Sequence, residues 1–140
     1  MTRRRATILS HWAAFLLLIL LLAGGPSPVL AWGYVAASGL MCALALVLGL
    51  LNGPGPKLTG AMRALHPWQS RGMYVVLGLT GLATLGHLLG RWPFDLPLER
   101  LWFVALSLSS LHAVFHLWRH TALGDGALRR ITPRTLHGIL

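Results

Sequence analysis

The chain has 140 residues, of which 55% are hydrophobic and 11% are charged, and its formal net charge is +9. A soluble domain of this length carries about a quarter charged residues, so the composition counts against a soluble globular enzyme, and its high hydrophobicity counts against a disordered chain. The one cysteine, Cys42, excludes an intramolecular disulfide and any metal site built from several cysteines.

Four apolar runs follow one another along the chain, and no charged side chain interrupts any of them. They cover residues 6–23, 29–51, 72–89 and 101–118. Each is close to the ~20 helical residues that cross ~30 Å of hydrocarbon. Segments with two prolines each separate them, at residues 24–28, 52–56 and 92–97. The sequence therefore predicts an all-α membrane protein, a four-helix transmembrane bundle forming a single domain over residues 1–140.

The first run has a second interpretation. Arg3, Arg4 and Arg5 before an apolar stretch are also typical of a signal peptide. The stretch is long for a signal peptide, and residues 24–26 make a poor cleavage site. We therefore favour a span that is retained.

Lysine and arginine are unevenly distributed between the two ends of the predicted bundle. Ten of the twelve lie in the N-terminal, 52–71 and C-terminal segments: Arg3, Arg4, Arg5, Lys57, Arg63, Arg71, Arg119, Arg129, Arg130 and Arg134. The positive-inside rule then predicts that both termini are cytoplasmic. Because the arginines flank apolar runs and form no single patch, we predict lipid contact and no nucleic-acid partner. We expect most of them to face lipid headgroups.

All six tryptophans lie near the ends of the apolar runs, which is typical of aromatic belts at the two membrane interfaces. They are Trp12, Trp68 and Trp118 at the predicted inner ends, and Trp32, Trp92 and Trp102 at the predicted outer ends.

Two histidines from different runs are predicted at the same depth. His11 follows Arg5 by six residues and His112 precedes Arg119 by seven, which is about 9 and 10 Å along a helix. An ionisable side chain within a span indicates a functional site, and haem iron takes two axial imidazoles between apolar walls. We predict that His11 and His112 are the axial ligands of the iron of haem b, although His11 also fits an interfacial anchor.

Two further histidines share a helical face with His112, because His116 and His120 follow it at spacings of four and eight. We expect both to lie around the haem, together with Arg130. His116 alternatively hydrogen-bonds a neighbouring helix. A histidine-only metal site also fits this face, but zinc and di-iron centres in bundles normally use carboxylates, which are scarce here.

The other three histidines receive weaker predictions. His66 precedes Pro67 and is expected in a solvated loop, and His137 in the C-terminal tail. His87 fits a haem ligand, a hydrogen bond to a quinone or an interface anchor, and the sequence leaves these open.

Two segments resemble the bacterial cytochrome b561 family of inner-membrane b-type cytochromes. The first is Ile8-Leu9-Ser10-His11-Trp12 with the apolar run that follows it. The second is a C-terminal pattern with the family's spacing: Leu111, His112, His120, Asp125, Leu128, Arg130 and Pro133. The resemblance implies a four-helix electron carrier with bis-histidine haems, in which the positions of His11 and His112 ligate the haem nearer the cytoplasm.

The chain departs from the family where a second haem would be held. No histidine occurs near Tyr34 or Val35, or near Leu98, where the family carries the ligands of its second haem. The family's third-helix histidine is also missing at the position that falls near Ser70. We therefore expect one haem. Shortened connections fit such a reduced variant.

The predicted function is a membrane cytochrome that carries single electrons between a quinone pool and a redox partner, or that serves as the haem subunit of a larger complex. Whether the chain itself turns over a substrate is left open. Candidate hydrogen-bonding groups for a quinone are His116, Ser107, Ser109 and Ser110. The alternative is a haem-free integral membrane anchor or assembly subunit with a basic inner face. A histidine-rich metal transporter or sensor is a third, weaker hypothesis.

Overall fold

The computed structural model describes residues 2–51 and 57–139, so the predicted break at 52–56 lies outside the described residues. The regular structure of the described residues is helical throughout, with no strand. Four helices are long: α1 (Arg3–Gly24), α2 (Pro28–Leu48), α3 (Gly60–Leu88) and α4 (Leu98–Thr121). A short helix, α5 (Ala127–Ile131), and a 3₁₀ turn (Arg134–Leu136) complete the C-terminal segment.

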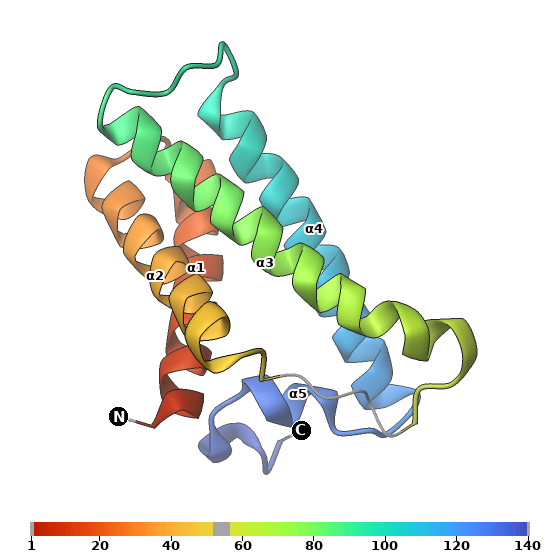
Figure 1. Ribbon diagram of the computed structural model, residues 1–140. Coiled ribbons are helices and arrows are strands. Elements are labelled where there is room, and N and C mark those ends of the chain that lie inside the picture. Colours follow the sequence, from red (N-terminus) through yellow and green to blue (C-terminus); the bar gives the residue numbers. More distant parts are fainter. Residues whose placement is uncertain (1, 52–56, 140) are drawn as a thin grey trace.

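The four long helices pack side by side in a closed order, in which α1 contacts α2 and α4, and α3 contacts α2 and α4. Figure 1 shows both termini and α5 at one end of these helices, and the α1–α2 and α3–α4 connections at the other. The short helix α5 packs against α4. It therefore covers the end at which the chain starts and finishes.

Proline and glycine set several helix ends as the sequence indicates. Pro28 begins α2, where its missing N–H costs nothing, and Gly25 before it has a φ of 83°. Gly49, with a φ of 79°, ends α2 three residues before the predicted end of its run. A side chain with a Cβ atom rarely adopts this left-handed conformation, which explains the early stop.

The start of α3 differs most from the prediction. It begins at Gly60 and passes through Pro67, so His66 lies within a helix and is 3% exposed. The expectation that His66 lies in a solvated loop is therefore wrong. A proline inside a helix removes one backbone hydrogen bond. Here a tertiary contact offsets that loss, because the His66 side chain is bonded to Arg119 of α4.

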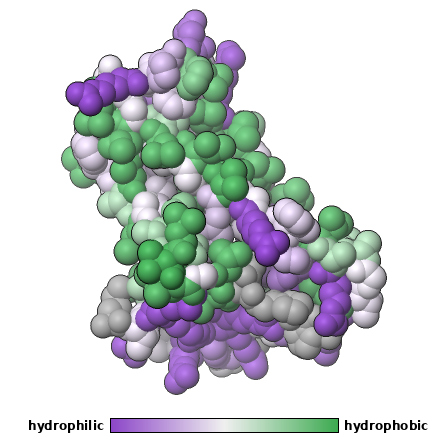
Figure 2. Space-filling view, viewed as in Figure 1, coloured by the Kyte–Doolittle hydropathy of each residue, from purple (hydrophilic) through white to green (hydrophobic). Residues whose placement is uncertain are grey.

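Three helices, α1, α2 and α4, are long and apolar enough to cross a membrane. Their outer faces expose large apolar side chains, including Leu16, Leu46 and Phe103. Figure 2 shows hydrophobic residues across the middle of the molecule and hydrophilic residues at its ends. Such an exposed apolar surface indicates contact with lipid. The three helices together indicate a multi-pass membrane protein.

The polar side chains in the apolar half of α3 face the protein interior. The Tyr34 hydroxyl lies 2.7 Å from Thr80 Oγ1, and Trp102 Nε1 donates to Thr84 Oγ1 at 3.0 Å. Trp102 has no exposed surface. Trp102 lies near the first turn of α4, at the predicted end of its run, but its indole N–H finds its partner on α3 and its ring fills the core instead of facing lipid.

Helices α2 and α3 approach closely at Gly81. A Cβ atom there would lie 2.6 Å from Ser38 Oγ. We expect Gly81→Ala to lower the free energy of unfolding by about 1–3 kcal/mol through overpacking, measured by thermal unfolding in detergent. Adding Ser38→Ala removes the clashing oxygen and should restore most of the loss. Gly78→Ala is the matched control, because its Cβ would meet only Cys42 Sγ at 3.6 Å. Equal stability of the Gly78 and Gly81 variants would contradict this close approach.

Candidate functional site

A cavity of about 400 Å³ lies between the long helices at the end that carries both termini, with α5 as part of its wall. Its volume is in the range of pockets that bind small molecules and cofactors. Four of the residues predicted around a haem line it, namely His11, His112, His116 and Arg130. His120 is not among the lining residues.

The wall of the cavity is mostly apolar, with polar groups contributed by several helices. The apolar lining comes from Ala14, Phe15, Leu18, Met41, Met73, Val76, Leu77 and Ala105. The basic lining side chains are Arg4, Arg119 and Arg130, and Ser109 is the one lining residue among the three serines proposed for a quinone. Such an amphipathic lining suits a ligand with an apolar body and an acidic group.

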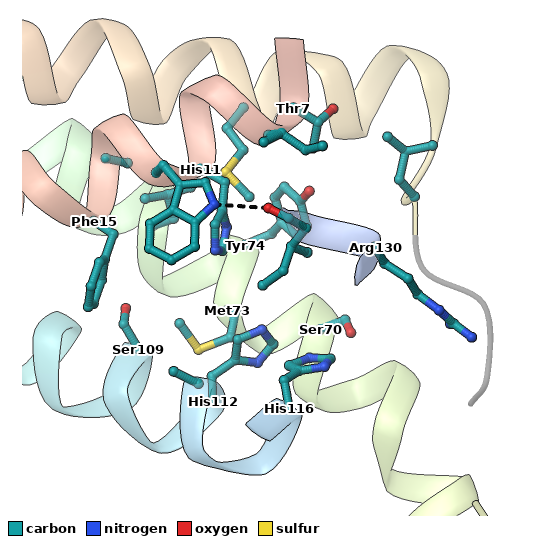
Figure 3. A pocket seen from close by; sticks show the side chains of 18 of the residues that line it. Thr7, His11, Phe15, Ser70, Met73, Tyr74, Ser109, His112, His116 and Arg130 are labelled. Atoms are coloured by element: carbon teal, nitrogen blue, oxygen red, sulfur yellow. Dashed lines mark hydrogen bonds between the residues drawn. The ribbon is translucent and has the colours of Figure 1, made fainter. Parts of the chain in front are cut away.

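Two helices bring the predicted ligands to one space. Figure 3 shows His11 of α1 on one side of the cavity and His112 and His116 of α4 on the other. The rings of His112 and His116 are 4.4 Å apart between centroids, because one helical turn separates them. In the described structure, Nδ1 of each of these two rings is buried without a hydrogen-bond partner. Buried polar atoms are rarely unpaired, so these two nitrogens are exceptions, but they have no accessible surface through which a ligand in the cavity could reach them.

His66 also lines this cavity, whereas His87, His120 and His137 are not among its lining residues. His120 Nδ1 is also buried without a partner among the described residues. His87 Nδ1 donates to the Ala83 carbonyl at 2.9 Å, and its ring packs against Trp92 at 5.2 Å, near the opposite end of the helices. His137 Nε2 donates to the Thr132 carbonyl at 3.2 Å.

A buried ion pair closes one side of the cavity. Arg119 is 1% exposed, and its Nε and Nη2 atoms donate to Asp125 Oδ2 at 2.8 and 2.6 Å. Its Nη1 atom donates to His66 Nε2 at 2.7 Å. Arg119 is therefore not among the arginines that face lipid headgroups. The pairing is favoured because a buried guanidinium requires a counter-charge and acceptors for its N–H groups.

The same network links three helices. Asp125 Oδ1 accepts a hydrogen bond from the backbone N–H of Ala127, the first residue of α5, at 2.9 Å. His66 belongs to α3, Arg119 to α4, and Asp125 holds α5 in place. Burial and then the guanidinium groups of Arg119 and Arg130 lower the pKa of His66 below its ordinary value. His66 is therefore neutral at physiological pH and can accept the hydrogen bond from Arg119.

The C-terminal segment is also tied to α1. Trp12 Nε1 donates to the Ile131 carbonyl at 2.9 Å, a bond drawn in Figure 3, and Arg4 Nη2 donates to the Arg129 carbonyl at 2.9 Å. The backbone of α5 therefore bridges α1 and α4 beneath the cavity. The C-terminal segment has no helical periodicity of apolar residues, so the sequence does not predict that it bridges α1 and α4.

Sequence reasoning missed His66, Arg119 and Asp125 as a unit. One signal was present: Asp125 is the only acid in the three basic segments. An isolated acid among many cations is a candidate for a buried ion pair, but the sequence does not tell which cation it meets. The resemblance had included Asp125 only as part of a spacing pattern.

Across residues 2–51 and 57–139, no group of three or more His, Cys, Asp or Glu side chains could hold a metal ion. A bis-histidine haem needs only two axial side chains, so a group of three is not required for it. Comparisons of the chain with models of known families, with curated proteins and with solved structures find no match. The residues that line the cavity are therefore the evidence for a cofactor.

Proposed function

We propose that the chain is a membrane-embedded b-type cytochrome in which His11 and His112 hold the iron of one haem. The observation that carries this proposal is that these two imidazoles, from α1 and α4, line one largely apolar cavity.

The residues of the cavity fit a haem in their chemistry. A porphyrin is a flat apolar ring with two carboxylates, so it needs apolar walls and basic or donating groups at one edge. Leu18, Phe15 and Val76 supply apolar surface, and Arg4 and Arg130 line the cavity as well. When bound, haem supplies reversible one-electron chemistry at its iron, while the protein supplies axial nitrogens, burial and nearby charge.

The proposal includes a fourth membrane span in α3. Its residues 72–88 include Thr80, Thr84 and His87, which lower its hydropathy. Thr80 and Thr84 are buried and hydrogen-bonded within the bundle, and an interior helix can carry such groups through the hydrocarbon when neighbours satisfy them. We further propose that the end with both termini is cytoplasmic, because ten of the twelve Lys and Arg residues belong to the segments at that end. The placement in a bacterial inner membrane rests on the resemblance to the cytochrome b561 family.

A cytochrome of this kind would pass single electrons between a quinone pool and a redox partner, or serve within a larger redox complex. This part of the proposal is supported by the resemblance to the cytochrome b561 family in the segments around His11 and His112. The lack of histidines near Tyr34 and Leu98 supports one haem per chain.

The test is an optical count of haem. The chain is expressed in membranes with haem supplied, purified in mild detergent, and compared in its dithionite-reduced and oxidised forms, with a pyridine haemochrome assay. We expect a b-type spectrum and one haem per chain. A folded preparation without haem would overturn the proposal and would favour the alternative function, a haem-free membrane anchor or assembly subunit. Two haems would overturn the single-haem assignment and make His87 the first candidate for a further ligand.

A further inference from the structure

We infer that His66 is a hydrogen-bond donor of fixed tautomer that binds a carboxylate oxygen of the cofactor through Nδ1. This inference rests on the proposed haem and extends it to a positioning residue on α3. Neither the apolar runs nor the resemblance assigns a role to His66.

The tautomer of His66 follows from its partner. Arg119 Nη1 lies 2.7 Å from His66 Nε2, and a guanidinium nitrogen can donate a hydrogen bond but cannot accept one. His66 Nε2 is therefore the acceptor, and the neutral ring carries its hydrogen on Nδ1. Arg119 is held in turn by two bonds to Asp125 Oδ2. The ion pair thus fixes which nitrogen of His66 can donate.

The Nδ1–H group has no acceptor within the described part of the protein, although His66 is 3% exposed and lines the cavity. The His66 ring meets the His116 ring edge-on at 6.1 Å between centroids. His116 follows His112 by one turn, about 6 Å along the helix toward the end that carries α5. His66 therefore lies nearer than His112 to the end of the cavity that carries α5. Arg119 and Arg130 also line the cavity.

An acceptor for this donor must come from a ligand with a polar edge. Apolar side chains on the rest of the wall cannot pair with carboxylates, so the acidic edge of a haem is stabilised at the basic end of the cavity. A donated hydrogen bond to a carboxylate is charge-assisted and strong. It offsets part of the negative charge beside the iron and thereby favours the ferrous state.

The experiment compares the unmodified chain with His66→Phe and His66→Gln, each loaded with haem or with haem dimethyl ester, whose carboxylates are uncharged. Phenylalanine keeps a planar ring without a donor, whereas glutamine can accept from Arg119 and still donate. With haem, we expect His66→Phe to lower the ferrous-to-ferric ratio at a fixed potential about threefold, roughly 30 mV at 59 mV per tenfold. We expect His66→Gln to restore most of it, and the ester to show little change.

An equal shift with haem and with the ester would overturn the inference, because His66 would then act without contacting a carboxylate. An unchanged haem potential in His66→Phe would overturn the inference as well. If that variant still binds one haem per chain, the cytochrome proposal is unaffected. If His66→Phe does not fold, the unmodified chain is labelled with ¹⁵N-histidine and studied in the ferrous state, with His66→Gln to assign the signal. The Nδ1–H resonance should then differ between haem and its ester, and identical resonances would overturn the inference.

Discussion

Replacing His112 by alanine is expected to reduce bound haem from one per chain to less than about a tenth of that amount. The loss follows because His11 would be the only one of the two proposed ligands left to hold the iron. His11→Ala should have the same effect from the opposite side of the cavity. The measurement is the pyridine haemochrome count per folded chain, with helicity in detergent checked by circular dichroism.

Two matched controls separate ligand loss from general damage. His87→Ala and His137→Ala remove histidines that do not line the cavity and bond only to the Ala83 and Thr132 carbonyls. Both variants should keep one haem. Full haem content in His11→Ala or His112→Ala would show that the iron is held elsewhere. If no variant or parent chain binds haem, the anchor hypothesis predicts that the function of these variants in membranes is unchanged.

Removing the carboxylate of Asp125 is expected to cost about 3–5 kcal/mol of stability, because Arg119 would remain buried without its counter-charge. Arg119 and Asp125 have side-chain exposures of 1% and 0%, so water cannot compensate for the missing partner. Asp125→Asn keeps the shape and tests the charge alone. Asp125→Ala also removes the hydrogen bond to the Ala127 backbone, and it should release α5 from the end of the cavity.

The measurement combines thermal unfolding in detergent with limited proteolysis of the segment after Arg119. We expect the single variants to unfold at lower temperature and to be cut faster in the segment 122–139. A double variant, Arg119→Met with Asp125→Leu, removes both charges and should recover most of the stability, since buried pairs can be replaced by apolar residues of similar volume. Wild-type stability in Asp125→Asn would mean that the pair does not hold this end of the protein together. Arg134→Met is the control, because this arginine lies in the exposed 3₁₀ turn.

The sequence by itself determined the four long helices and most of their ends. Long apolar runs favour helices, because a helix pairs its backbone N–H and C=O groups within the same segment. Pro28 and Gly25 set the boundary between α1 and α2 through their own backbone conformations. It also predicted that His11 and His112 lie at one depth, since the rise per residue is constant along a helix. Both residues line the same cavity, as that reasoning predicted.

Only the tertiary structure decided which faces of the helices meet. Periodicity gives the spacing along one helix, but the rotation of each helix about its axis depends on contacts between residues distant in sequence. The 2.6 Å approach that a Cβ at Gly81 would make to Ser38 is one such contact. Trp102 became a core residue because Thr84 of α3 accepts its N–H.

The ion pair shows the same limit at the candidate site. In the sequence, Arg119 is one of the arginines that flank an apolar run, but in the structure it is buried. Its partners reach it because α3 extends back to include His66, and because the chain turns at residues 122–126 and brings Asp125 to its side chain. These contacts join three helices at one point. Their free energy comes from burial of charge with its partners, a property that depends on three-dimensional surroundings and that no segment carries alone.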